Sequence, residues 1–160
     1  MGTGKSSVGK ILAERLSRPL ADVDLYIEAN EKRKIGAIFH EAGEAYFRSL
    51  EKKAIREICG RQGIVITTGG GAVLDPENLD ALKASGWVIG LSATPETIYR
   101  RVKNLRHRPL LEGKDKLREI ERLLAARKPY YEKADFTVET DGRSSVQVAG
   151  LILEKLADKL

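Results

Sequence analysis

The sequence predicts an α/β fold of three layers, with helices on both faces of a mostly parallel sheet. Short β-branched runs alternate with segments in which apolar residues recur at helical spacing. Two of the helical segments are introduced by Asp-Pro or Thr-Pro, an N-cap residue followed by proline at the first helical position. No internal repeat, low-complexity tract or long linker divides the 160 residues, so we expect a single domain over residues 1–160.

Composition is typical of a folded globular chain. Hydrophobic residues make up 42% and charged residues 32% of the sequence, which excludes the low hydrophobicity of disordered chains. The net charge of +5 suits nucleic acid, an acidic membrane or a small anionic ligand, and does not choose among them. A single cysteine, Cys59, and no visible signal peptide or long apolar span predict a reducing, cytoplasmic setting. Cys59 ends a helical pattern, where we interpret it as a packing residue.

The first half of the chain contains two expected strands. A helix is predicted over 6–16, followed by a short buried strand over 19–24. Helical patterns follow over 25–33 and 44–58, and in the second of these Phe47, Leu50, Ala54 and Ile58 share one face. The β-branched run 63–68 then predicts a strand buried on both faces, which ends in three glycines.

The second half continues the alternation. The expected elements are a helix start at Asp75-Pro76, a buried strand over 87–91, a helix start at Thr94-Pro95, a polar and basic stretch over 104–114, a helix with Leu117, Ile120, Leu123 and Leu124, a strand over 136–140 and a final helix with Val148, Ile152 and Leu156. The basic stretch is either a solvated loop or, in a nucleotide-binding protein, a lid over about 104–116 that closes on phosphates.

The N-terminal stretch MGTGKSS contains the second half of a phosphate-binding loop, G-x-x-x-x-G-K-[ST]. A simple turn is the alternative, but a helix and a strand ending in two aspartates follow, as such a loop requires. We therefore expect residues 2–7 to bind nucleotide: Gly2, Thr3, Gly4, Lys5, Ser6 and Ser7. Glycines let the backbone approach the β-phosphate, Lys5 contributes charge to the β- and γ-phosphates, and the Ser6 hydroxyl reaches Mg²⁺.

Two carboxylates, Asp22 and Asp24, lie at the C-terminal end of the first expected strand, the end where open α/β sheets bind ligands. They project on the same side if the strand persists that far. The functional interpretation places Asp22 near Mg²⁺ and gives Asp24 the task of orienting a substrate hydroxyl and accepting its proton. The alternative is that Asp24 caps a helix beginning at Leu25.

The glycine triplet 69–71 is either a permissive turn or a place where a ligand approaches backbone N–H groups, and we favour close approach because three glycines cost backbone entropy. Arg48 has Glu44 and Glu51 one turn away on either side, so an ion pair and a ligand contact are equally compatible with its position. Arg106 and Arg108 lie in the basic stretch, and Arg127 falls where a helix runs into Lys128-Pro129.

Taken together, six segments resemble the shikimate kinases in order and spacing. They are GTGKS, DVD, AYFRSLE (45–51), TGGGAV (68–73), RHRPLL (106–111) and ARKPYYEKAD (126–135). The resemblance covers essentially the whole chain. Members of this family are small P-loop kinases of the nucleoside-monophosphate-kinase type, which transfer the γ-phosphoryl of ATP to the 3-hydroxyl of shikimate on the route to chorismate and aromatic amino acids.

The resemblance implies roles for individual residues. It implies a carboxylate clamp of Arg48, Arg127, Gly70 and Gly71, a base and hydroxyl ligand at Asp24, a water-linked Mg²⁺ partner at Asp22, a lid arginine at Arg108 and adenine-flanking arginines at Arg101 and Arg143. Catalysis is then expected from Asp24, Lys5 and Arg108. ATP is the co-substrate and Mg²⁺ the cofactor, and we expect a cytoplasmic monomer that binds neither nucleic acid nor membrane. Few aromatic side chains are present for stacking on nucleic acid.

The sequence departs from the family pattern at the first glycine of the phosphate loop, which would fall two positions before Met1. In the family the preceding strand is central in a five-stranded parallel sheet of order 2-3-1-4-5, and its loss would leave buried backbone groups unpaired. We therefore expect an apolar strand ending in glycine in about ten residues before Met1. The alternatives are a truncated or non-catalytic nucleotide-binding member of the family, or a related small-molecule kinase such as a gluconokinase-like enzyme.

Overall fold

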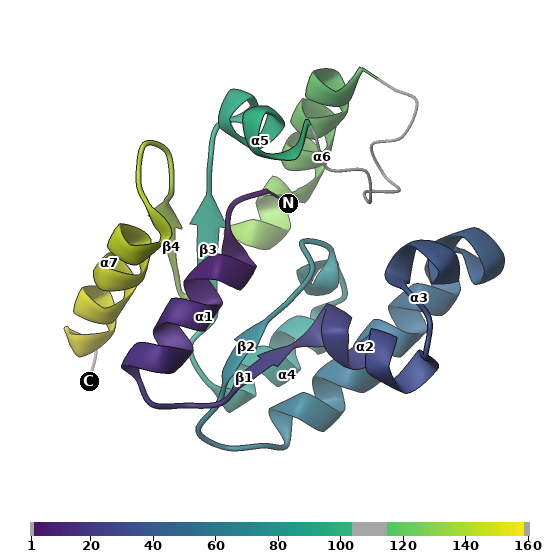
Figure 1. Ribbon diagram of the computed structural model, residues 1–160, viewed down its shortest axis with the longest axis horizontal. Coiled ribbons are helices and arrows are strands. Elements are labelled where there is room, and N and C mark those ends of the chain that lie inside the picture. Colours follow the sequence, from purple (N-terminus) through teal and green to yellow (C-terminus); the bar gives the residue numbers. More distant parts are fainter. Residues whose placement is uncertain (1, 104–114, 159–160) are drawn as a thin grey trace.

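The computed structural model describes residues 2–103 and 115–158, and its helices and strands alternate as expected (Figure 1). In chain order the elements are α1 (Lys5–Arg15), β1 (Leu20–Asp22), α2 (Val23–Glu31), α3 (Ile35–Cys59), β2 (Val65–Thr67), η1 (Ala72–Leu74), α4 (Pro76–Ser85), β3 (Ile89–Ser92), α5 (Pro95–Val102), α6 (Lys116–Tyr131), β4 (Phe136–Glu139) and α7 (Ser145–Ala157).

The strands form two parallel pairs. β1 pairs with β2 in the register Leu20–Val65 to Asp22–Thr67, and β3 pairs with β4 in the register Ile89–Phe136 to Ser92–Glu139. Within the described ranges the two pairs are separate sheets, and Figure 1 shows them lying apart. The parallel direction predicted from the sequence is confirmed, but a continuous sheet is not formed by these residues.

A cavity of about 420 Å³ lies between β2 and β3. Residues 64–70 line one side and residues 88–93 line the other, with Val8, Leu12 and Ile152 from the neighbouring helices. Because the inner edges of β2 and β3 have no strand partner among the described residues, an extended segment would find backbone groups to pair with here. The strand expected before Met1 stays a prediction.

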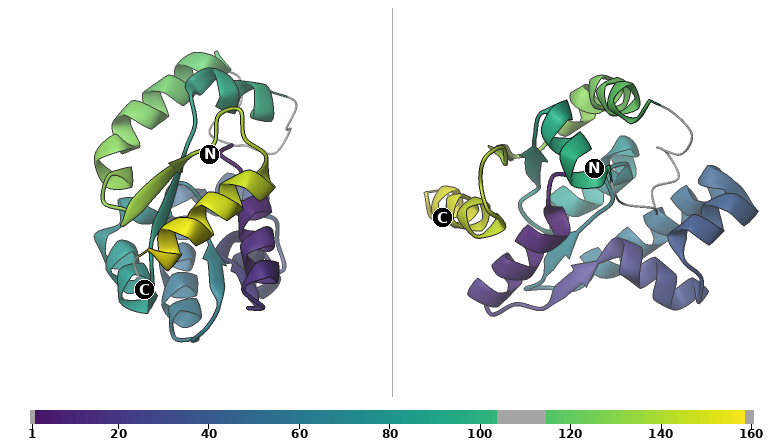
Figure 2. Two further views of the ribbon diagram at one scale, coloured as in Figure 1. Left: turned by 90° about the vertical axis from the view of Figure 1, so that its left-hand side faces the viewer. Right: turned by 45° about the horizontal axis from the view of Figure 1, so that its top comes forward.

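Helices cover both faces of the strands, which gives the predicted three layers. The side chain of Val65 packs with α1 and α7, whereas that of Ile66 packs with α3 and α4, so β2 is apolar on both sides as its β-branched run predicted. α1 and α7 lie side by side (Figure 2). A third apolar cluster joins α5 to α6. Cys59 packs against the α3 cluster, as predicted.

Local capping agrees with the sequence signals at α4 and α5, and α7 carries a further cap. The Asp75 carboxylate accepts a hydrogen bond from the Glu77 N–H (2.9 Å) at the start of α4, and the Thr94 hydroxyl accepts one from the Thr97 N–H (3.3 Å) at the start of α5. At α7, Ser144 and Gln147 form a reciprocal capping box. No helix in the described part of the chain is both long and apolar enough to cross a membrane.

Three boundaries differ from the prediction. β1 ends at Asp22, so Asp24 lies in the first turn of α2 rather than on the strand. α3 begins at Ile35, and its first part was missed because Gly43, with φ 81° and ψ 171°, kinks the helix and interrupts the apolar pattern. α6 continues through Pro129 to Tyr131, because a proline in the last turn removes only one helical hydrogen bond.

Close packing of α1 on β2 predicts that Gly9→Ala destabilises the chain, since a Cβ at Gly9 would overlap the Thr67 methyl group. We expect the free energy of unfolding in urea to fall by about 1–3 kcal/mol. Gly36→Ala in α3 is the matched control, because no heavy atom lies within 4 Å of its added Cβ. That variant should be neutral or stabilised by up to about 1 kcal/mol. Equal unfolding midpoints for the two variants would contradict the packing argument.

Candidate functional site

The phosphate loop leads directly into α1, as the sequence predicted. Gly2 (φ 65°) and Gly4 (φ 92°) adopt left-handed backbone conformations that favour glycine, and Gly4 is the N-cap of α1. Lys5 begins the helix, and Ser6 and Ser7 are exposed in its first turn. Because the first turn carries no acidic residue, its N–H groups and the helix dipole offer a site for phosphate oxygens. The Thr3 side chain is buried, and its hydroxyl has no hydrogen-bond partner among the described residues.

Asp22 performs the capping role that the sequence left open for Asp24. One Asp22 carboxylate oxygen accepts from the Leu25 N–H (3.1 Å) and the other accepts from the Thr67 hydroxyl (2.7 Å). The interpretation of Asp24 as a helix cap is therefore wrong. The misplacement has a simple cause: the strand ends two residues earlier than expected, which moves the N-cap from Asp24 to Asp22.

Asp24 is left without such partners. Its Oδ1 atom is buried and has no hydrogen bond among the described residues. Burial raises the pKa of the Asp24 carboxyl above its usual range and the charge of Asp22 adds to this, whereas the charges of Lys5 and Arg48 act in the opposite direction. The phosphate-loop lysine and a carboxylate at the start of α2 are thus electrostatic neighbours.

Arg48 makes both of the ion pairs that its spacing predicted. Its guanidinium donates to Glu44 (3.0 Å) and to Glu51 (2.7 Å). Glu51 is only 1% exposed, and its second oxygen, Oε1, has no hydrogen-bond partner among the described residues. Burial raises the pKa of the Glu51 carboxyl, opposed by the charge of Arg48 and more weakly by that of Arg127.

Glu51 is a site residue that the sequence reasoning used only as a partner for Arg48. A signal was present, because Glu51 lies four residues after Phe47 and three before Ala54 and therefore on the apolar face of the helix. A carboxylate on a core-facing position requires a partner or a ligand, since burying it alone is costly.

The glycine turn lies against these charged groups. A Cβ at Gly69 would lie 3.4 Å from both Asp24 Oδ1 and Glu51 Oε1, so the two unpartnered oxygens border the same position. A Cβ at Gly71 would overlap the Arg48 guanidinium. Neither glycine has a positive φ, so Gly69 and Gly71 are needed for space rather than for backbone conformation. The atoms nearest to Gly69 and Gly71 thus belong to the protein's own side chains.

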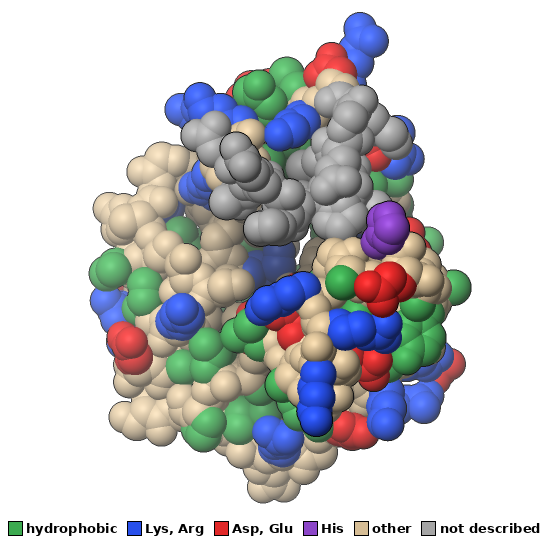
Figure 3. Space-filling view, turned by 45° about the vertical axis from the view of Figure 1, so that its right-hand side comes forward, with side chains coloured by type: hydrophobic (Ala, Val, Ile, Leu, Met, Phe, Trp, Pro, Cys, Tyr) green, Lys and Arg blue, Asp and Glu red, His purple; other side chains and the backbone are tan. Residues whose placement is uncertain are grey.

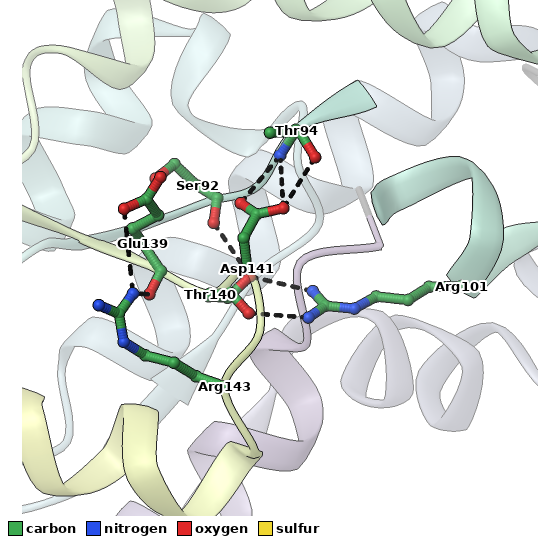
Figure 4. Close-up of polar contacts among 7 residues, drawn as sticks. All are labelled: Ser92, Thr94, Arg101, Glu139, Thr140, Asp141 and Arg143. Atoms are coloured by element: carbon green, nitrogen blue, oxygen red, sulfur yellow. Dashed lines mark hydrogen bonds and ion pairs between the residues drawn. The ribbon is translucent and has the colours of Figure 1, made fainter. Parts of the chain in front are cut away.

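α6 adds Arg127 to the side of the site that holds Glu51, and the turn after β4 lies at the other end, next to the phosphate loop. Arg127 is 8% exposed on α6, near enough for its charge to act on Glu51. In Figure 4, Arg101 donates to the Thr140 hydroxyl and carbonyl oxygen (both 2.9 Å). Arg101 also reaches the Gly2 carbonyl oxygen at 3.4 Å, which joins α5 to the phosphate loop.

Asp141 connects the turn after β4 to the start of α5 through hydrogen bonds. Its carboxylate accepts from the Thr94 N–H (3.0 Å) and the Thr94 hydroxyl (2.8 Å). Arg143 donates to the Glu139 carbonyl oxygen at 2.8 Å (Figure 4). Arg101 and Arg143 thus both lie at the turn after β4, and their expected position beside adenine stays a prediction. Arg108 and most of the expected lid lie outside the described residues. A space-filling view shows Lys and Arg side chains around a hollow on one side of the molecule (Figure 3).

Parallel strands, a glycine loop opening α1 and converging basic side chains define the chain as a P-loop kinase by fold and site. Comparison with known proteins points to one family of kinases. A family model described as shikimate kinase matches residues 1–157. The shikimate kinase of Symbiobacterium thermophilum is 44% identical over 162 residues, which cover 99% of this chain and 93% of that protein. The chain belongs to the shikimate kinase family, and the resemblance stated from the six segments is confirmed.

Solved structures agree with this assignment. A shikimate kinase from Acinetobacter baumannii in complex with shikimate superposes with a TM-score of 0.96 at 34% identity, covering 99% of this chain and 89% of that one. A gluconokinase from Sinorhizobium meliloti 1021 matches with a TM-score of 0.63 at 19% identity, covering 99% and 90% of the two chains. The second match shows a shared fold alone.

The buried, unpartnered carboxylate of Asp24 predicts that Asp24→Asn stabilises the chain at pH 7. The folded-state pKa is raised above the unfolded value, so the native state loses stability as the pH rises from the unfolded pKa through the folded pKa. Removing the charge should restore on the order of 1 kcal/mol at pH 7. The gain should shrink towards pH 4, because the wild-type carboxyl takes up its proton as the pH falls.

Urea unfolding at both pH values measures this difference. Asp80→Asn on α4 is the matched control, because Asp80 is exposed. A gain for Asp24→Asn that does not change with pH would contradict the role of charge burial.

Proposed function

We propose that the chain transfers the γ-phosphoryl group of ATP to the 3-hydroxyl of shikimate. The observation that carries this proposal is the convergence of Asp24, Glu51 and Arg48 on the glycine turn, next to Lys5 of the phosphate loop. Membership of the shikimate kinase family supports it, and the A. baumannii relative binds shikimate. A substrate with a carboxylate at one end and hydroxyls at the other matches this distribution of cations and acceptors.

The carboxylate of the substrate is assigned to Arg48 and Arg127, with backbone groups at Gly70 and Gly71. Arg48 donates to Glu44 through Nε and Nη2 and to Glu51 through Nη1, which fixes the plane of its guanidinium before a ligand arrives. A guanidinium fork binds a carboxylate with two parallel hydrogen bonds, which an ammonium group does not. Arg127 is buried, and its guanidinium makes no ion pair within the described ranges, so its donors suit a ligand.

Asp24 is assigned as the ligand of the substrate hydroxyl and as the base. Its unpartnered Oδ1 supplies the acceptor, and a pKa above the usual range makes its carboxylate a stronger base near neutral pH. The charges of Lys5 and Arg48 oppose that shift and favour the ionised form of the carboxyl. Phosphoryl transfer needs alignment, positive charge and exclusion of water more than covalent help from the protein.

Magnesium is the metal that this chemistry implies, and the residues present fit it. Mg²⁺ prefers oxygen ligands and is held by one or two protein groups together with substrate phosphates and waters. In the described ranges no group of three or more His, Cys, Asp or Glu side chains is placed to hold a metal, so a fully protein-bound site is not built there. The exposed Ser6 hydroxyl would bind the ion directly and Asp22 through water. The ion would neutralise charge on the β- and γ-phosphates.

Arg101, which donates to Thr140, and Arg143, which donates to Glu139, are assigned to the adenine end of ATP. Arg108, the assigned lid arginine, would add charge at the transferred phosphoryl group. The cytoplasmic location and the monomeric state remain predictions from the sequence, the first supported by the free thiol of Cys59.

Arg48→Ala tests the carboxylate clamp. Loss of charge-assisted hydrogen bonds, worth about 1.5–3 kcal/mol, should raise the KM for shikimate roughly 10- to 150-fold. The KM for ATP should stay within about twofold, because Arg48 lies at the substrate end. Arg56→Ala on the same helix is the control, since Arg56 is exposed and pairs with Glu77. An equal rise in both KM values would contradict the assignment.

Asp24→Asn tests the base. We expect kcat to fall by a factor of about 10² or more, with nucleotide binding retained. In the wild type, kcat/KM should fall on acidification as the pH passes down through the raised pKa of Asp24, because the protonated carboxyl cannot accept the hydroxyl proton. A coupled assay of ADP release with shikimate measures both. Near-normal turnover by a folded Asp24→Asn variant would refute the base role.

A further inference from the structure

A side-chain hydrogen bond joins α6 to the glycine turn. The hydroxyl of Tyr131, the last residue of α6, donates to the Gly70 carbonyl oxygen at 2.8 Å. Tyr131 follows Arg127 by four residues, so both side chains project from one face of the helix. The same face of α6 therefore carries Arg127, which is assigned to the substrate carboxylate, and Tyr131, which contacts the backbone of the glycine turn.

This contact fixes the orientation of one peptide group. The Gly70 carbonyl and the Gly71 N–H belong to the same planar trans peptide and point in opposite directions. Holding the carbonyl towards Tyr131 therefore holds the Gly71 N–H on the other side. Glycine on both sides of this peptide leaves no Cβ to oppose its rotation, which would exchange the donor for an acceptor.

Neighbouring hydrogen bonds do not hold this peptide. Within the turn, Ala72 N–H donates to the Gly69 carbonyl oxygen (3.2 Å) and Leu74 N–H donates to the Gly71 carbonyl oxygen (3.1 Å). Both bonds use groups of the adjoining peptides. In the described part of the chain the Gly71 N–H donates no hydrogen bond, and the Gly71 Cα lies against the Arg48 guanidinium.

We propose that Tyr131 is a positioning residue that keeps the Gly70–Gly71 peptide turned with its N–H towards the substrate carboxylate. The inference rests on the proposed function, since it assigns that carboxylate to this position. Without the Tyr131 hydroxyl the peptide populates the rotated state, in which a carbonyl oxygen faces the carboxylate and repels it. The substrate carboxylate then lacks the Gly71 N–H as a donor unless the peptide first rotates back, and this weakens binding.

Tyr131→Phe tests this proposal by removing one hydroxyl and leaving the ring. We expect the KM for shikimate to rise about 5- to 10-fold, the effect of losing roughly one hydrogen bond, while the KM for ATP stays within about twofold. Tyr130→Phe is the matched control. Tyr130 is the preceding residue, is half-buried, and contacts the Lys133 ammonium through its ring (5.6 Å) rather than the glycine turn. It should change neither KM.

A second substrate separates positioning from general support of the fold. Shikimate methyl ester lacks the charge that the N–H would stabilise, so the penalty of Tyr131→Phe should shrink to about twofold or less with the ester. An equal penalty with acid and ester would overturn the proposal. So would a rise in both KM values accompanied by a lower thermal unfolding midpoint, because that pattern indicates a merely structural contact.

Failure of the proposed function would look different. Calorimetric titration of the wild-type chain with shikimate, together with the kinase assay, reports on it independently. If the wild type neither binds nor phosphorylates shikimate, the proposed function is wrong and the proposal for Tyr131 falls with it. If the wild type does both and Tyr131→Phe binds shikimate equally well, the proposal for Tyr131 alone is overturned.

Discussion

The arrangement of the site depends on the contacts of the Thr67 side chain at the end of β2. Its hydroxyl donates to Asp22, which joins the ends of β1 and β2 and caps α2. Its methyl group packs where Gly9 leaves room on α1. One residue thus contacts α1, which follows the phosphate loop, and the N-cap of α2, whose first turn carries Asp24. The glycine turn begins two residues after Thr67. A side chain with a hydroxyl and a methyl group is required, because each contact uses a different one.

Charge burial is the second constraint. Asp24 and Glu51 are carboxylates with raised pKa values, and each keeps one oxygen without a hydrogen bond among the described residues. Such groups lower the stability of the chain in the absence of ligand. Arg48 offsets part of this cost at Glu51, and the apolar cluster around Ile55 and Ile58 supplies the stability that tolerates the rest. A site prepared for hydroxyl donors is therefore held by the core on the same face of α3, because Ile55 and Ile58 follow Glu51 by four and seven residues.

Much of the fold and part of the site could be predicted because the signals are local. The caps at Asp75 and Thr94, the left-handed glycines before α1 and the doubly buried β2 all follow from short stretches of sequence. The sequence did not predict that Asp22, and not Asp24, caps α2, since this depends on where a three-residue strand ends. The contacts of Tyr131 with Gly70 and of Arg101 with Thr140 join residues far apart in the chain, and no periodic pattern reports such contacts.

The separation of the two strand pairs bears on how the two halves of the domain unfold. No backbone ladder connects the pairs within the described ranges, so α1 is a principal link: it packs on β1 and β2 in one half and on α7 in the other. The phosphate loop opens this same helix, and Arg101 ties its first residues to α5. A nucleotide bound there would act on the element that couples the halves, so its binding free energy would add to the cooperativity of unfolding.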